Sequence, residues 1–328
     1  MMELRTLGSQ GLTVSAQGLG LMGMSAFYGS TDEAESLATI DRALELGVTL
    51  FDTAEIYGPF INEQLLGKAL TGRRDQAVIA TKTGIEIGDD GAVTGLNGRP
   101  EYIFRALDRS LRHLNTDYVD LYYLHRVDPQ VPIEDTVGAM GELVDTGKVR
   151  HIGLSEASPQ TIRRAHRIHP LTAVQTEYSL FERGIEQDGV MATLNELGIG
   201  LVAYAPLGRG FLSGAITSPD NFAADDYRRI DPRFQGENFQ RNLAVVNEVR
   251  RIAAAKKVTP SQLALAWVLH QGAVAIPGTK RRRYLEENSA AAAVTITTQE
   301  MAAIEAVAPH GTVAGDRYTP DQMQLLNG

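Results

Sequence analysis

The chain has 328 residues, a formal net charge of −9 and no cysteine. The lack of cysteine excludes disulfides, thiolate metal sites and cysteine nucleophiles, and no other pattern indicates a metal site. Because affinity for nucleic acid comes from clustered Lys and Arg, the acidic balance argues against a nucleic-acid partner. No apolar stretch reaches the length of about 18 residues that a membrane span needs, and residues 1–12 contain no apolar signal-peptide region. We therefore expect a cytoplasmic protein with no membrane partner.

Short apolar runs alternate with segments of helical periodicity, a rhythm typical of α/β folds. The start, residues 4–15, indicates a hairpin or loop. Apolar runs predict strands at residues 17–19, 49–53, 78–80, 119–124, 152–154, 173–175, 201–203 and 274–276. The first helix is predicted to begin at a capping box formed by Ser30 and Glu33 and to end at Gly47. Further helices are predicted at residues 62–70, after Pro100, from Pro132 to Gly147, and around residues 284–288.

Eight strands, each followed by a helix, indicate a single (β/α)8 TIM barrel over residues 1–328, with an N-terminal hairpin and long loops on its C-terminal face. No change of composition and no linker divides the chain. The segment 207–241 is too long for an ordinary βα loop and predicts a lid or clamp. Barrel enzymes carry their chemistry at the C-terminal ends of the strands. The polar residues there are Asp52, Lys82, His125, Ser155, Glu156, Gln175, Tyr204 and the turn from Gly278 to Lys280.

The stretch from Gly18 to Gly23 fits the G-x-G-x-x-G pattern of dinucleotide-binding βαβ units. That pattern requires a helix immediately after the glycines and an acidic residue about 20 positions later. Here residues 24–29 resemble a loop, and the later position falls in the middle of a predicted helix. We interpret the glycines as the end of the first barrel strand.

Asp52, Tyr57, Lys82 and His125 follow three consecutive predicted strands, the second, third and fourth. An unpaired ammonium inside a barrel is costly, so Lys82 needs an anionic partner, and Asp52 lies one strand away. Taken singly, the pair could be structural and the histidine a core residue. Together they favour catalysis, because an ammonium close to Tyr57 is expected to lower the phenol pKa from about 10 towards the working pH.

Five phrases, in order along essentially the whole chain, resemble the aldo-keto reductase superfamily. They are Phe51–Gly58, Ile79–Lys82, Asp120–His125, Gly153–Ser155 and Ile276–Lys280. Residues 156–158 and 315–318 are similar to a plant and bacterial branch that includes perakine reductase and auxin-induced-protein-like members. The resemblance implies NADPH-dependent reduction of an aldehyde or ketone to an alcohol. In this scheme Tyr57 is the general acid, Lys82 and Asp52 tune it, and His125 orients the carbonyl.

A run of four cations from Lys280 to Arg283 follows the last predicted strand. Such runs are often solvated faces, but late βα loops and helix N-termini of barrels recurrently bind phosphate. Lys and Arg suit a 2′-phosphate, so NADPH is expected rather than NADH. The resemblance implies contacts of Gly278, Thr279 and Lys280 with the adenosine phosphate, Glu287 and Asn288 with adenine, Ser155 and Gln175 with the carboxamide, Tyr204 with the nicotinamide face, and Leu207 and Gly208 with the pyrophosphate.

The chain departs from the family pattern at three positions. Glu156 replaces an Asn that many members carry beside the carboxamide-binding Ser, and its role is open. Gly278 and Tyr284 stand where the best-known branch has Lys and Arg. The sequence therefore leaves open which of Arg281, Arg282 and Arg283 holds the 2′-phosphate.

Two other functions compete with carbonyl reduction. The superfamily resembles the β subunits of potassium channels, in which a barrel is a cofactor-binding regulatory partner. A Schiff-base aldolase using Lys82 is a second alternative, but it requires a neutral lysine, whereas Asp52 should keep this one charged. The expected partner is a small carbonyl substrate whose identity, like the oligomeric state, is open. Its specificity should come from residues 22–28, 85–97 and 207–241 and from the tail after Pro309.

Overall fold

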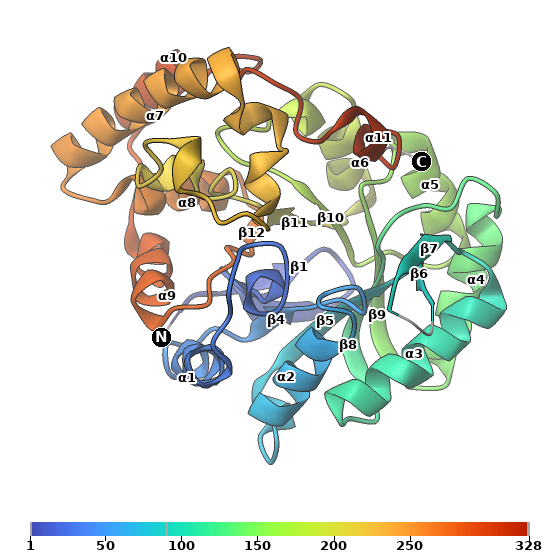
Figure 1. Ribbon diagram of the computed structural model, residues 1–328. Helices are drawn as coiled ribbons and strands as arrows, with labels where there is room; N and C mark the ends of the chain where they lie inside the picture. The colour runs from blue at the N-terminus through green and yellow to red at the C-terminus, as the bar shows by residue number, and fades with distance from the viewer. Residues whose placement is uncertain (1, 89–90, 327–328) are drawn as a thin grey trace.

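The computed structural model describes residues 2–88 and 91–326, in which eight parallel strands form one sheet (Figure 1). The strands are β3 (Leu19–Gly20), β4 (Leu50–Asp52), β5 (Val78–Thr83), β8 (Val119–Leu124), β9 (Val149–Ser155), β10 (Ala173–Glu177), β11 (Gly200–Tyr204) and β12 (Val274–Ala275). Each pairs with its neighbour in chain order. Parallel bridges from Gln17 to Ala275 and from Gly20 to Gly278 join the first strand to the last. The sheet therefore closes, and the predicted (β/α)8 barrel is confirmed.

Helices follow the strands and surround the barrel (Figure 1). They are α1 (Glu33–Glu45), α2 (Ile61–Ala69), α3 (Pro100–Leu114), α4 (Ile133–Asp145), α5 (Pro159–Ile168), α6 (Val190–Leu197), α7 (Gly236–Lys256), α8 (Pro260–His270), α9 (Arg282–Ser289), α10 (Thr298–Val307) and α11 (Pro320–Met323). The predicted start of the first helix was wrong. Asp32 caps α1 through its side chain, which accepts the Glu35 N–H at 3.1 Å, so Ser30 lies outside the helix. No helix in the described ranges is both long and apolar enough to cross a membrane.

Two antiparallel hairpins accompany the barrel. The first pairs β1 (Leu4–Leu7) with β2 (Leu12–Ser15), as the sequence suggested. Its residues Leu7, Leu12 and Val14 pack with the residues inside the barrel and cover its N-terminal end. The second pairs β6 (Ile85–Ile87) with β7 (Val93–Leu96) within the segment 85–97, which had been expected to be a loop.

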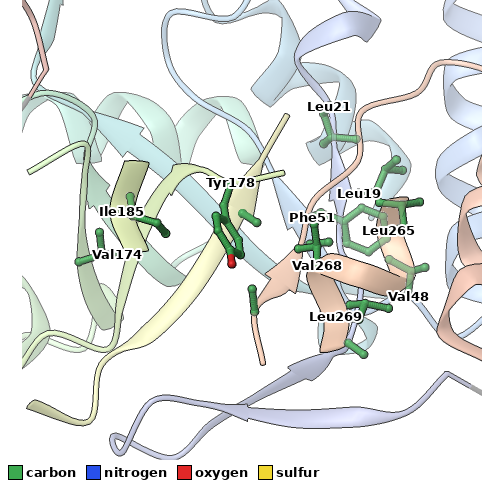
Figure 2. Close-up of a cluster of buried hydrophobic side chains, with 14 of the residues drawn as sticks. Leu19, Leu21, Val48, Phe51, Val174, Tyr178, Ile185, Leu265, Val268 and Leu269 are labelled. Atoms are coloured by element: carbon green, nitrogen blue, oxygen red, sulfur yellow. The ribbon is translucent and has the colours of Figure 1, made fainter. Parts of the chain in front are cut away.

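The core has two layers separated by the sheet. Side chains inside the barrel include Leu50, Ala80, Leu121 and Val202. Between the sheet and the helices lies a second layer, part of which Figure 2 shows, with Phe51 of β4 close to Val268 of α8. Successive side chains of a strand point to opposite faces, so Leu50 faces inward and Phe51 outward. This alternation decides which polar residues reach the interior.

The segment 207–241 is folded rather than open. It contains four short 3-10 helices, η4 (Phe211–Ser213), η5 (Pro219–Asn221), η6 (Tyr227–Arg229) and η7 (Pro232–Phe234), and its last residues already belong to α7. The ring of Phe211 lies 4.9 Å from that of Phe234 and 5.0 Å from that of Phe239. These buried aromatic contacts hold the segment against the barrel.

Candidate active site

Side chains along each strand alternate between the inside and the outside of the barrel. Several of the predicted polar residues point inward at the C-terminal end of the barrel interior, here called the barrel mouth. In β4 the inward residue Leu50 is followed two positions later by Asp52, and in β5 Ala80 is followed by Lys82. The same period of two places Gln175 after Ala173 in β10. Asp52, Lys82 and Gln175, which the sequence placed at the ends of strands, therefore lie close together because they share the inner face of the sheet.

Lys82 lies at the centre of this site and is fully buried. Its Nζ donates to Asp52 Oδ1 at 2.5 Å, to the backbone oxygen of Thr53 at 2.8 Å and to the Tyr57 hydroxyl at 3.3 Å. These contacts use all the N–H donors of an ammonium. They argue against the Schiff-base alternative, because a lysine nucleophile needs a free nitrogen lone pair.

The electrostatics of Tyr57 correct one expectation. Burial, followed by the nearby Asp52 carboxylate, raises the pKa of Tyr57 well above its usual 10, and only Arg126 opposes this. The expected fall is not produced, because burial and the Asp52 carboxylate outweigh the effect of the nearby cations. Burial also lowers the pKa of Lys82, against the opposing effect of Asp52. Tyr57 is therefore a protonated phenol at neutral pH, a proton donor rather than a base.

His125 stands beside Tyr57 at the end of β8. The two rings are 6.0 Å apart between centroids and nearly perpendicular. The Nδ1 atom of His125 is buried without a hydrogen-bond partner among the described residues. Burial, with the charges of Arg126 and Lys82, lowers the pKa of His125 well below 6.5. The imidazole is therefore neutral at physiological pH and can hydrogen-bond an uncharged substrate oxygen.

Arg126 is a site residue that the sequence analysis missed. It follows His125 directly, and its Nη1 donates to the His125 carbonyl at 2.7 Å and to Ser155 Oγ at 3.2 Å. The available signal in the sequence was its position two residues past the end of β8, directly after His125. Arg126 thus connects the ends of β8 and β9.

Glu156 anchors the C-terminal tail. Its carboxylate forms a bidentate pair with Arg317, at 3.0 and 2.7 Å, and also accepts the Thr176 hydroxyl and the Glu177 N–H. Burial alone favours the neutral acid, but Arg317 and Arg126 lower the pKa of Glu156 below its usual value. Its backbone is left-handed, with φ of 56°, a strained conformation for a side chain of this kind. Both oxygens of Glu156 are thus bound by described residues, and these contacts give this side chain a role in holding the tail.

The tail also reaches Tyr204. The hydroxyls of Tyr204 and Tyr318 are hydrogen-bonded at 2.8 Å. The guanidinium of Arg209 lies 4.5 Å from the centre of the Tyr318 ring, and it pairs with the buried Glu177 at 3.2 Å. The tail after Pro309, expected to contribute to substrate specificity, is thus fixed at the barrel mouth by an ion pair and a phenol pair.

Ser155 and Gln175 have the donor and acceptor groups that a carboxamide needs. Gln175 Nε2 donates to Asp52 Oδ2 at 2.7 Å, and its Oε1 accepts no hydrogen bond from a described residue. The Ser155 oxygen accepts from Arg126, which leaves its hydroxyl hydrogen for another acceptor. Together they can accept one carboxamide N–H and donate to its oxygen. Nearby, Leu207 and Gly208 form a tight turn, in which the Gly208 N–H donates to the Ala205 oxygen at 2.8 Å.

Two of the four cations from Lys280 to Arg283 already bind other parts of the protein. Lys280 Nζ donates to the backbone oxygens of residues 28–30, at 2.8, 3.4 and 2.6 Å. Arg282 pairs with Glu35 through its side chain, at 2.9 Å, and through its backbone N–H, at 3.1 Å. Arg281 and Arg283 are both exposed, and neither forms an ion pair with a described residue. Arg283 Nη2 donates to the Tyr284 hydroxyl at 3.1 Å, so Arg281 is the freest cation of the run.

The remaining cofactor candidates lie around the same turn. Thr279 accepts the Arg281 N–H at 3.2 Å, and Gly20 and Gly278 face each other across the closing bridge. In α9, the side chain of Asn288 is buried and Glu287 is half-buried.

Comparison with known proteins places the chain in a family. The model of the family described as "Aldo/keto reductase family" matches residues 17–309. The glycerol dehydrogenase AKR11B4 from Gluconobacter oxydans is 29% identical with a TM-score of 0.85, and the match covers 96% of this chain and 98% of that one.

Two further solved structures are similar over nearly their full length. The holo form of aldo-keto reductase AKR11C1 from Bacillus halodurans is 28% identical, with a TM-score of 0.78 and coverage of 98% and 99%. An aldo/keto reductase from Klebsiella pneumoniae, in complex with NADP and acetate, is 26% identical, with a TM-score of 0.75 and coverage of 97% and 99%. Since the family model spans most of the chain, this protein belongs to the aldo/keto reductase family.

Proposed function

We propose that the protein reduces an aldehyde or ketone to an alcohol, with Tyr57 as proton donor, Lys82 and Asp52 as its supporting pair and His125 as the residue that orients the carbonyl. The observation that carries this proposal is the position of Lys82 Nζ, which bonds Asp52 Oδ1 at 2.5 Å and the Tyr57 hydroxyl at 3.3 Å. The substrate is a small carbonyl compound.

The protein is an NADP-dependent oxidoreductase. NADPH, when bound, supplies the hydride that no side chain can provide. The free Oε1 of Gln175 and the hydroxyl of Ser155 fit the carboxamide, and Tyr204 is proposed to pack on the nicotinamide face. Leu207 and Gly208 are proposed at the pyrophosphate. For the adenosine end we propose Gly278, Thr279, Lys280 and Arg281 near the 2′-phosphate, with Glu287 and Asn288 near the adenine.

The side chains around Tyr57 support the transfer of one proton from its hydroxyl to the substrate. As the carbonyl carbon is reduced, its oxygen takes the phenol proton of Tyr57 and becomes the alcohol. The tyrosinate left behind lies beside two cations, Lys82 at 3.3 Å and, further away, Arg126, which lowers the Tyr57 pKa. Both favour the ionised phenol while it exists, and water then restores the proton. The neutral His125 donates a hydrogen bond to the same substrate oxygen, which polarises the carbonyl.

The regulatory alternative remains a distinct proposal, because a channel-associated barrel could keep every one of these residues. The two proposals differ in turnover: an enzyme oxidises NADPH over many cycles with a carbonyl substrate, whereas a regulatory barrel is expected to complete fewer than one. We further propose that residues 1–328 form one barrel domain and that the protein works in the cytoplasm.

A hydride-tracing experiment tests the proposed reaction. The purified protein is incubated with aldehydes and NADPH carrying deuterium at C4 of the nicotinamide, and the product is analysed by mass spectrometry and NMR. We expect an alcohol with deuterium on the former carbonyl carbon and a matched loss of NADPH absorbance over many turnovers. Oxidation of NADPH without alcohol, or fewer than one turnover with every carbonyl, contradicts the enzyme and favours the regulatory alternative.

A further inference from the structure

Arg126 is a half-buried cation without a carboxylate partner among the described residues. Its two hydrogen bonds, to the His125 carbonyl and to Ser155 Oγ, both come from Nη1. No described residue accepts a hydrogen bond from its Nε or Nη2. Arginine presents its N–H groups as a planar fork that suits a carboxylate. Donors on the other arm of this fork are therefore available to a ligand.

The other buried cations around the barrel mouth are all neutralised. Lys82, Arg209 and Arg317 each lie within 3.2 Å of a carboxylate oxygen. Glu156 is the carboxylate whose charge most affects Arg126, but its oxygens are already taken by Arg317. A guanidinium that is partly removed from water and lacks a carboxylate partner is unfavourable unless a bound anion neutralises its charge.

The location of Arg126 connects that anion to the reaction. Its neighbours along β8 and β9 are His125 and Ser155, which serve the carbonyl and the carboxamide in the proposed function. Its charge also acts on Tyr57, whose pKa it lowers. Because Arg126 follows His125 directly, we expect the remaining atoms of a molecule whose carbonyl oxygen lies between Tyr57 and His125 to come within reach of Arg126. The cofactor phosphates are proposed elsewhere, at residues 207–208 and 278–281, so they do not supply the missing charge.

We propose that Arg126 is a substrate-binding residue that recognises a carboxylate, and that the preferred substrates are aldehydes or ketones carrying an ionised carboxylate, that is, oxo acids. This inference rests on the proposed function and names its substrate class. The carboxylate is bound by the free Nε and Nη2 groups of Arg126, while Nη1 keeps its bonds to His125 and Ser155. The reaction is otherwise unchanged, because the carboxylate takes no part in hydride or proton transfer.

The effect of the substrate's carboxylate charge is measured by comparing each acid with its methyl ester. The pairs are 4-formylbenzoate with methyl 4-formylbenzoate, and succinate semialdehyde with methyl 4-oxobutanoate. For each, kcat and KM are measured for the wild type, Arg126→Met, Arg126→Lys and a surface control, Arg251→Met, whose side chain is exposed on α7. Binding of benzoate and of benzamide is compared by calorimetry at constant ionic strength, which gives a readout independent of turnover.

In at least one pair the wild type should prefer the acid by about 10- to 100-fold in kcat/KM, mainly through KM, as expected for a charged hydrogen-bonded pair. Arg126→Met should reduce that ratio to near one and abolish benzoate binding, Arg126→Lys should keep part of the preference, and Arg251→Met should behave as wild type. Equal losses on acid and ester in Arg126→Met, or a wild type that prefers both esters, overturn the carboxylate site but leave the reductase intact. A wild type that reduces no aldehyde at all contradicts the proposed function and this inference together.

Discussion

Arg317 in the C-terminal tail forms a bidentate ion pair with Glu156 at the end of β9, with N–O distances of 3.0 and 2.7 Å. The side chain of Glu156 is 1% exposed and that of Arg317 is 12% exposed, so both charges are removed from water. This pair joins Glu156, a position where the sequence departs from the family pattern, to the C-terminal tail, which was expected to contribute to substrate specificity.

Arg317→Met should destabilise the protein strongly. The substitution leaves the buried Glu156 carboxylate without its countercharge, a change that typically costs about 3–5 kcal/mol. The double variant Glu156→Gln with Arg317→Met should recover part of this loss. Unfolding in urea can be followed by the fluorescence of Trp267, which is the only tryptophan of the chain and is fully buried.

The matched control for this measurement is Arg251→Met, which breaks a pair with Glu248 on the solvent-exposed face of α7. It should leave the unfolding midpoint unchanged, because exposed pairs contribute little. A midpoint for Arg317→Met as high as that of the control would contradict the anchoring role of the tail.

Glu55 should make stability depend on pH in the neutral range. Burial raises its pKa from 4.5 to about 7, against the opposing effect of Arg109, whose Nη2 lies 2.7 Å away. Between these two values the folded state binds more protons than the unfolded state, so stability falls as pH rises through this window. The fall is at most about 3 kcal/mol. Urea unfolding at pH 5 and pH 8 measures it, and Glu55→Gln should flatten the difference. An identical slope in that variant would show that other groups cause it.

The rate of reduction should be nearly constant from about pH 6 to pH 9. The pKa of His125 is lowered well below 6.5 and that of Tyr57 is raised well above 10, both chiefly by burial, so neither residue changes its charge in this range. The measurement is kcat against pH at saturating NADPH and aldehyde. An inflection near pH 6.5 that disappears in His125→Gln would mean that the histidine titrates in the working range.

Glu35 should weaken the preference for a 2′-phosphate. Its carboxylate bonds both the backbone N–H and the side chain of Arg282 at the start of α9, where an anion would bind. Glu35→Gln removes the competing charge and should tighten NADPH binding about threefold, while NADH binding stays the same. Fluorescence titration of both nucleotides checks this. A parallel change for NADH would place the effect away from the phosphate.

The sequence was sufficient to predict the barrel and its strand-end residues, for a physical reason. Parallel strands buried on both faces read as short apolar runs, and the side-chain period of two projects Asp52 and Lys82 into one interior. Tyr57 was found in the loop five residues after the strand-end Asp52, and the motif resemblance then gave it the role of general acid.

The remaining features depend on contacts between distant segments, which local patterns do not encode. The pairing of Glu156 with Arg317 spans 161 positions. The three backbone oxygens that hold Lys280 lie about 250 positions away. The expected lowering of the Tyr57 pKa also failed for this reason, because it depended on the burial of Tyr57 and on the balance between Asp52 and Lys82, which only the assembled site defines.

The most direct test of the account is a single-turnover comparison of the wild type with Tyr57→Phe, each loaded with NADPH and mixed rapidly with an aldehyde. Phenylalanine keeps the ring and removes only the proton donor, so NADPH affinity and the unfolding midpoint should match the wild type. The rate of NADPH oxidation should fall by about 100- to 10,000-fold, the usual contribution of a positioned general acid. A rate within a few-fold of wild type, with NADPH binding intact, would contradict the assignment of Tyr57 as the proton donor.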